Sequence, residues 1–196
     1  MSANAPRHKL VLIGGKEVGK TSLASQFCFQ RFVEDYDPTI GDLHRKTVLV
    51  DGHASTIDIL DTSGDGKYTI LSSREIAQGQ GFLLVYSITS RSSFSHLRTL
   101  YAEIQQVRGS LGTCYPVPVM LIGNKNDCKW EREVSTQEGR AFARELGCKF
   151  VEASAKDYQT VEGVFYDPVR ILNDKGRRTG IWNSVRKVIS RYICRM

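Results

Sequence analysis

The sequence predicts an α/β domain in three layers, with helices on both faces of a six-stranded, mostly parallel sheet. The main observation is that short apolar runs, which suit buried strands, alternate with helical stretches along the chain. The second is that the first apolar run, residues 9–13, ends on a glycine-rich turn that leads directly into a helical stretch. With 196 residues, the chain is long enough for one such core but hardly for two. We therefore expect one domain over residues 1–173, followed by a tail of residues 174–196.

Individual elements are assigned from the same patterns. Strands are expected at residues 9–13, 45–50, 56–60, 81–87, 117–122 and 149–153. Helices are expected near residues 19–30, 91–108, 135–146 and 160–172. The third helix has a start signal, because Ser135 is followed three positions later by Glu138, a capping-box pattern. Pro168 stands inside the fourth helix, and since an interior proline costs about 3 kcal/mol, we expect an irregular last helix.

The positive charge of the chain is confined to its tail. The net charge is +6, and residues 174–196 hold seven basic residues against one acid, so the body is neutral. Nucleic acid is therefore not expected as a partner. The five cysteines stand far apart without a CxxC pair, and neither a signal peptide nor a membrane span is evident. These features predict a cytoplasmic protein.

A phosphate-binding loop follows the first expected strand. The sequence GGKEVGKT satisfies the pattern GxxxxGK[ST] between a strand and a helix, which is the context that this motif requires. An incidental glycine turn is the alternative. In such loops the backbone N–H groups face phosphates, the lysine reaches the β- and γ-phosphates, and the final hydroxyl ligates Mg²⁺. The expected phosphate-binding residues are Gly14, Gly15, Lys16, Glu17, Val18, Gly19, Lys20 and Thr21.

Two later segments favour guanine over adenine. NKND (Asn124 to Asp127) and SAK (Ser154 to Lys156) each follow an expected strand, and an open α/β sheet binds ligands at the carboxyl ends of its strands. The carboxylate of Asp127 can accept hydrogen bonds from the ring N–H and the exocyclic amine of guanine. Adenine lacks this donor pair, and a site built for it rejects a base that leaves the carboxylate unpaired.

With these motifs in this order, residues 8–172 resemble the Ras family of small GTPases. YDPTI (residues 36–40) is similar to the first switch of that family, DTSG (residues 61–64) to the start of its second switch, and FYDPVR (residues 165–170) to its last helix. The resemblance implies the P-loop NTPase fold, GTP or GDP as the ligand and Mg²⁺ as the metal.

The resemblance also implies roles for single residues. Phe32 is expected to stack on guanine, Lys125 to pack along it, and the Ala155 N–H to meet its carbonyl oxygen. Thr39 is expected to bind Mg²⁺ and the γ-phosphate, and the Gly64 N–H to sense that phosphate. The other residues carried over are Tyr36 and Pro38 near the nucleotide, Asp61 holding Mg²⁺ through water, and Asn124, Asp127, Ser154 and Lys156 around the base. Thr21, Thr39 and Asp61 form the expected metal set, and Lys20, Thr39, Gly64 and Asp65 the expected catalytic set.

The sequence departs from the family at positions that bear on hydrolysis. Asp65 stands where the family has a water-positioning glutamine, and it is shorter, accepts only when ionised, and adds negative charge beside the phosphate. Lys16 and Glu17 replace two glycines where an activating protein would insert an arginine. We expect slow intrinsic hydrolysis and weak stimulation by an activating protein. Two alternatives stay open: Lys16 is a built-in cation that pairs with Asp65, or both loop charges point into solvent.

The expected partners follow from the switch segments. Effector proteins are expected to bind residues 36–44 and 64–68, and a guanine-nucleotide exchange factor and a GTPase-activating protein to act on a monomer. Because residues 41–44 (GDLH) differ from the common effector sequence of the family, the choice of effector is open. A pseudo-GTPase, a binding module held in one nucleotide state, is the alternative function.

The tail combines basic residues with an apolar stripe. Residues from Ile181 to Ile193 carry apolar side chains at helical spacing, with arginines and lysines largely elsewhere, which suits an anionic membrane surface. Cys194 is third from the end, whereas the prenylation signal of the family has cysteine fourth. Binding at the inner face of the plasma membrane, packing of the stripe on the body, and a disordered tail that only solubilises the protein remain alternatives.

Overall fold

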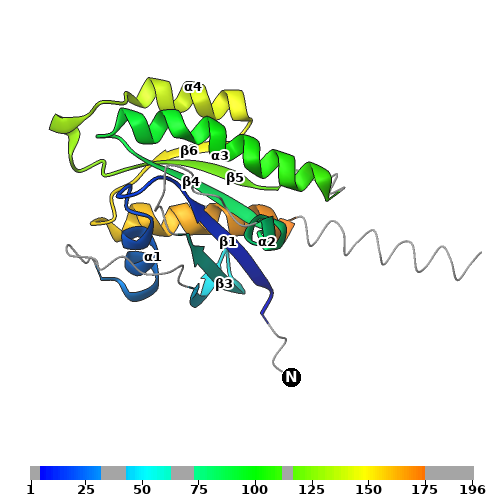
Figure 1. Ribbon diagram of the computed structural model, residues 1–196. Coiled ribbons are helices and arrows are strands. Elements are labelled where there is room, and N and C mark those ends of the chain that lie inside the picture. Colours follow the sequence, from blue (N-terminus) through cyan, green and yellow to red (C-terminus); the bar gives the residue numbers. More distant parts are fainter. Residues whose placement is uncertain (1–4, 32–42, 63–72, 112–116, 175–196) are drawn as a thin grey trace, which may run out of the picture.

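The chain forms a three-layer α/β domain in the computed structural model, which describes residues 5–31, 43–62, 73–111 and 117–174 (Figure 1). The strands are β1 (Arg7–Ile13), β2 (Leu43–Val50), β3 (His53–Asp61), β4 (Gly81–Ser87), β5 (Val119–Asn124) and β6 (Lys149–Glu152). The helices are α1 (Lys20–Phe29), α2 (Ser73–Gln78), α3 (Arg91–Ser110), α4 (Thr136–Leu146), a 3-10 turn η1 (Lys129–Glu131), and an unlabelled last helix over residues 158–174.

The six strands form one mostly parallel sheet in the order β2-β3-β1-β4-β5-β6, as the sequence predicted. Only β2 is antiparallel to its neighbour, because a two-residue turn, Asp51 and Gly52, joins it to β3. Both turn residues have positive φ, 50° and 76°, which matches the twist of a tight hairpin. The strand order reverses between β1 and β4, so the loop after β1 lies at the switch point of the sheet.

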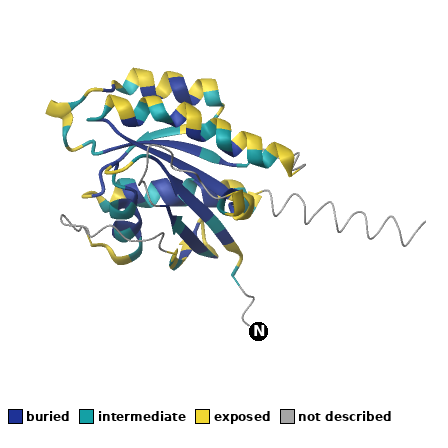
Figure 2. Cartoon of the chain, in the orientation of Figure 1, coloured by how far each residue is buried: buried dark blue, intermediate teal, exposed yellow. Residues whose placement is uncertain are grey.

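Each face of the sheet carries its own apolar core. Alternate side chains of β1 point to opposite faces, so Leu10 and Leu12 join one core while Val11 and Ile13 join the other. The first core is covered by α1 and the last helix, and the second by α2, α3 and α4 (Figure 1). Burial follows this layering, since the central strands β1, β4 and β5 are mostly buried and the outer faces of the helices are exposed (Figure 2). The expectation of helices on both faces is confirmed.

The helix signals are only partly confirmed. Ser135 caps α4 as expected: its side chain accepts from the Glu138 N–H, and Glu138 bonds back to the Ser135 N–H. The expected irregularity at Pro168 is wrong, because the last helix runs uninterrupted over residues 158–174. Proline removes one backbone donor, but Pro168 is buried beside the core residues Phe165 and Val169, and this packing keeps the helix on the sheet.

Candidate functional site

The phosphate loop lies between β1 and α1, and two of its glycines are required by close backbone approach. A Cβ on Gly14 would lie 2.2 Å from the Val85 carbonyl oxygen. A Cβ on Gly19 would lie 2.3 Å from Nδ2 of Asn124, and Gly19 also has a φ of 91°. Glycine is the residue that meets both demands without strain. The loop therefore packs directly against the ends of β4 and β5.

Lys20 is held over this loop. Its side chain is buried, and its ammonium donates hydrogen bonds to the carbonyl oxygens of Gly14 at 3.0 Å and Gly15 at 2.8 Å. A buried lysine keeps its charge only when such partners offset the lost hydration. The structure thus fixes a positive charge at the place where the sequence predicted phosphates.

Thr21 and Asp61 come together from two elements. The Thr21 hydroxyl, in the first turn of α1, donates a hydrogen bond to Oδ2 of Asp61, the last residue of β3. The next residue, Thr62, donates from its hydroxyl to the Leu12 carbonyl at 2.7 Å, which ties the end of β3 to β1. Hydroxyl and carboxylate oxygens are ligands that Mg²⁺ prefers, and it commonly uses one or two carboxylates with phosphate oxygens. These two residues fit the predicted metal, whereas residues 5–31, 43–62, 73–111 and 117–174 hold no cluster of three or more His, Cys, Asp or Glu side chains suited to a metal ion.

The two guanine segments lie side by side because β5 and β6 are parallel neighbours. The Asn126 N–H, in the first segment, donates to the Ala153 carbonyl at 3.0 Å, directly before the second. Asn124 is buried, and its Nδ2 donates to the Val18 carbonyl of the phosphate loop at 2.8 Å. Its Oδ1 is also buried, without a hydrogen-bond partner among the described residues. Asn124 therefore ties the first guanine segment to the phosphate loop, and Asn126 ties it to the residue before the second.

Asp127 is held as an ionised acceptor. The Ser154 hydroxyl donates to its Oδ1 at 2.7 Å, and the Lys156 ammonium lies 3.3 Å from its Oδ2. Burial raises the pKa of Asp127, but the bonds from Ser154 and the backbone and the charge of Lys156 more than offset this, so its pKa lies below the ordinary 3.8. Ser154 also accepts from the Lys156 N–H at 3.1 Å, which fixes the second segment.

Some of the remaining predicted site residues lie in the described part of the chain and the others lie outside it. Val18 and Ala155 are buried, while Lys16 and Glu17 are exposed at the tip of the loop, where Glu17 has a φ of 61°. Lys125 also has a positive φ, 65°. The predicted site residues outside the described part of the chain are Phe32, Tyr36, Pro38, Thr39, Gly64 and Asp65. The tail beyond residue 174, residues 36–42 and residues 64–68 lie outside it too.

Sequence reasoning missed a polar group behind the guanine segments. Arg132 binds Glu152, the last residue of β6 before the second segment, and reaches Asn126 in the first segment. Asn126 lies in the loop after β5, 6 positions from Arg132, and Glu152 at the end of β6, 20 positions from it. Neither spacing belongs to a known motif. No pattern in one sequence would have paired them.

The fold, with this loop at the switch point of the sheet, defines a P-loop nucleotide-binding protein. The sequence model of the Ras family matches residues 9–174. The chain therefore belongs to the Ras family and is a Ras-like, GTP-binding small GTPase.

Individual relatives agree with this assignment. "Ras-like protein 1" of Pyricularia oryzae is 52% identical over 186 residues, covering 88% of this chain and 77% of the relative. "Protein ras-2" of Neurospora crassa is 49% identical over 188 residues, covering 88% and 82%. "Ras-like protein B" of Aspergillus fumigatus is 47% identical over 187 residues, covering 86% and 78%. In the described segments, none of the helices has the length and apolar character that crossing a membrane requires.

Proposed function

We propose that the chain is a guanine-nucleotide-dependent switch in signal transduction that binds GTP and GDP with Mg²⁺ and hydrolyses GTP slowly. The observation that carries the proposal is the fixed carboxylate of Asp127. It stands at the end of the first guanine segment, ionised, with Ser154 and Lys156 holding its two oxygens.

The phosphate end of the nucleotide is assigned to the loop and the first turn of α1. Lys20 would turn its ammonium from the two loop carbonyls toward the β- and γ-phosphates, which are stronger partners because they carry charge. Thr21 and Asp61, with Thr39, would hold Mg²⁺, whose bound charge offsets that of the phosphates. The Gly64 N–H would contact the γ-phosphate.

The base end is assigned to the two segments that follow β5 and β6. Asp127 accepts from the two guanine donors, while Lys125 packs along the ring and the Ala155 N–H donates to its carbonyl oxygen. Asn124 ties this part of the site to the phosphate loop through the Val18 carbonyl. A nucleotide with adenine would leave the Asp127 carboxylate without its pair of donors, and this loss sets the preference for guanine.

Slow hydrolysis is proposed because Asp65 replaces the glutamine that orients the attacking water in the family. The test is single-turnover GTP hydrolysis by the wild type and by Asp65→Gln. We expect the Asp65→Gln variant to be faster. A wild-type rate at or above that of an ordinary Ras protein would contradict slow hydrolysis, and would favour Lys16 as a built-in cation.

The same aspartate favours one alternative, a pseudo-GTPase held in one nucleotide state. The nucleotide content of GTP-loaded protein, followed over hours, separates the two functions. Conversion of bound GTP to GDP supports the switch. Persistent GTP supports the pseudo-GTPase.

Effector binding is proposed for residues 36–44 and 64–68. Of the first segment the structure describes Leu43 and His44, at the start of the edge strand β2. Leu43 is exposed, and the exposed ring of Phe29 lies edge-on to His44 with their centroids 5.9 Å apart. An apolar surface beside the switch is suited to bind a partner protein.

A further inference from the structure

We propose that Arg132 is a positioning residue for guanine recognition, which holds the two base-binding segments in register from the side away from the nucleotide. The inference rests on the proposed function and deepens it. It concerns how tightly and how selectively the base is held, and it assigns Arg132 no contact with the nucleotide.

Arg132 makes a two-point ion pair with Glu152, the last residue of β6. Its Nη1 donates to Oε1 at 2.7 Å and its Nη2 to Oε2 at 2.9 Å. The two side chains are largely buried, with exposed fractions of 21% and 13%. The Thr136 hydroxyl donates to the same carboxylate at 2.9 Å. A parallel, two-point pair of this kind fixes orientation as well as distance.

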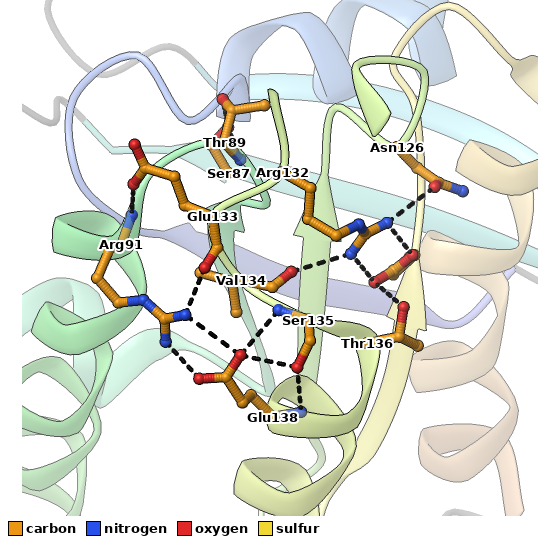
Figure 3. A network of polar contacts seen from close by, with 11 residues as sticks. Ser87, Thr89, Arg91, Asn126, Arg132, Glu133, Val134, Ser135, Thr136 and Glu138 are labelled. Atoms are coloured by element: carbon orange, nitrogen blue, oxygen red, sulfur yellow. Dashed lines mark hydrogen bonds and ion pairs between the residues drawn. The ribbon is translucent and has the colours of Figure 1, made fainter. Parts of the chain in front are cut away.

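The guanidinium of Arg132 also reaches the first guanine segment. Its Nη2 lies 3.4 Å from Oδ1 of Asn126, and its Nη1 donates to the Val134 carbonyl at 3.0 Å (Figure 3). Asn126 is the residue directly before Asp127, and Glu152 stands two positions before Ser154. Arg132 therefore joins the first segment to the end of β6, two positions before Ser154, which binds Asp127.

The register of the two segments decides the geometry of the base site. The Asn126 N–H bonds to the Ala153 carbonyl, and the Ser154 hydroxyl bonds to Asp127, so both contacts depend on the same spacing. Hydrogen bonds weaken steeply with poor alignment. A small shift of one segment against the other would move the Asp127 carboxylate relative to the guanine donors.

The pair is strong enough to impose that spacing. Burial raises the pKa of Glu152, but the bonds from Arg132 and Thr136 lower it by more. The pKa of Glu152 therefore lies below its ordinary value, and the side chain is ionised. The pKa of Arg132 is raised by the same pair. Removing Arg132 would leave the largely buried Glu152 carboxylate with one hydroxyl donor, and such a carboxylate draws in water or moves toward solvent. Either response loosens the end of β6.

Arg98 offers a matched control. It lies in α3 and binds Glu145 of α4 through two points as well, with Nη2 to Oε2 at 2.7 Å, and the shared ion pair leaves both guanine segments untouched. The Arg98–Glu145 pair is more exposed than the Arg132–Glu152 pair. Because it does not contact the guanine segments, Arg98→Gln measures the effect of losing an arginine ion pair that lies away from the base site.

The test measures release of a fluorescent GDP, and competition between GDP and IDP, for the wild type, Arg132→Gln, Arg132→Lys and Arg98→Gln. IDP lacks the exocyclic amine, so the GDP-to-IDP preference reports the second hydrogen bond to Asp127. We expect Arg132→Gln to release GDP about tenfold faster, equivalent to ~1.4 kcal/mol, and to lose much of the GDP-to-IDP preference. Arg132→Lys keeps the charge without the two-point geometry and should be intermediate. Arg98→Gln should match the wild type.

A purely structural role would lower the melting temperature and speed the release of GDP and IDP alike, with the preference unchanged, and that outcome would overturn the inference. Equal behaviour of Arg132→Gln and Arg98→Gln would also overturn it. If Arg132→Gln does not fold, Arg132→Lys alone decides by the same preference. A wild type that binds neither nucleotide would instead contradict the proposed function.

Discussion

The Thr21 hydroxyl donates a hydrogen bond to the carboxylate of Asp61, 40 residues further along the chain. This contact joins the first turn of α1, directly after the buried Lys20, to the end of β3. Two of the three residues proposed for Mg²⁺ are therefore adjacent before any ligand is considered, and the third, Thr39, lies outside the described residues. A preassembled site loses less conformational freedom when it binds a metal.

Thr21→Ala should make nucleotide release insensitive to Mg²⁺. In the wild type, chelating Mg²⁺ with excess EDTA should speed GDP release by at least about tenfold, because the bound metal stabilises the nucleotide complex. Thr21→Ala removes a ligand, so its release should be fast with or without EDTA. Thr21→Ser keeps the hydroxyl and should behave as the wild type does. An undiminished EDTA response in Thr21→Ala would show that the metal is held without this hydroxyl.

Glu138 should titrate at unusually low pH. The hydrogen bond from Arg91, helped by bonds from the Ser135 side chain and backbone, lowers the pKa of Glu138 from 4.5 to about 2. Because the folded-state value is the lower one, the pair stabilises the fold fully above the unfolded value, near 4.5, and this is lost as pH falls toward 2. An NMR titration of the Glu138 side chain should show no midpoint above pH ~3 in the wild type.

Arg91→Gln should move that midpoint upward, toward the ordinary value for glutamate. Arg98→Gln, which breaks the neighbouring pair with Glu145, should leave it unchanged. A Glu138 midpoint that is the same in Arg91→Gln and the wild type would mean that the capping bonds to Ser135 alone set the low pKa.

Much of the fold could be predicted because its central strands are buried on both faces. The segment GFLLVYS was expected as a strand at residues 81–87 and is found at Gly81–Ser87, with every residue buried. The short elements were missed. A helix of six residues, Ser73–Gln78, and a turn of three, Lys129–Glu131, contain too few positions to show a helical period.

Part of the candidate site could likewise be predicted from the sequence, and part could not. The phosphate loop, Asp127 and Ser154 lie in short motifs, so their spacing in sequence carries the signal. The contacts of Arg132 with Asn126 and Glu152 depend on how the loop after β5 folds against the end of β6. Opposite charges are common along any chain, and only the tertiary structure selects which of them meet.

Tyr86→Phe should stabilise the protein. The Tyr86 side chain is fully buried, and among the described residues its hydroxyl has no hydrogen-bond partner. A Cβ on Gly139 or Gly123 would lie within 2.6 Å or 2.9 Å of this hydroxyl, so the site is already crowded. This burial, with the charge of Glu152 adding to it, raises the pKa of Tyr86.

Phenylalanine keeps the ring contact with Phe94, whose centroid lies 4.8 Å away, and removes the unpaired oxygen. The free energy of unfolding in urea should rise by about 1 kcal/mol. Tyr101→Phe is the control, because the Tyr101 hydroxyl donates to the Leu146 carbonyl at 3.4 Å and its loss should not stabilise. A less stable Tyr86→Phe would reveal a bound water on the Tyr86 hydroxyl.

Glu17→Gln and Lys16→Gln should change GDP affinity in opposite directions. Both residues are exposed at the tip of the phosphate loop, and glutamine removes the charge of each while matching the size of glutamate. Glu17 has a φ of 61°, and glutamine meets the same backbone demand, so the comparison isolates charge from strain. Since the loop is proposed to bind phosphates, Glu17→Gln should lower the Kd for GDP about threefold and Lys16→Gln should raise it about threefold at low salt.

Both effects should shrink as the salt concentration rises, because exposed charges are screened within about 10 Å at 0.1 M. Equilibrium titration with fluorescent GDP at two salt concentrations measures them. If neither substitution changes the Kd at low salt, the two charges point into solvent, and the unusual loop has no electrostatic effect on the nucleotide. Slow hydrolysis would then depend on Asp65 alone, and Asp65→Gln would be sufficient to restore the rate of an ordinary Ras protein.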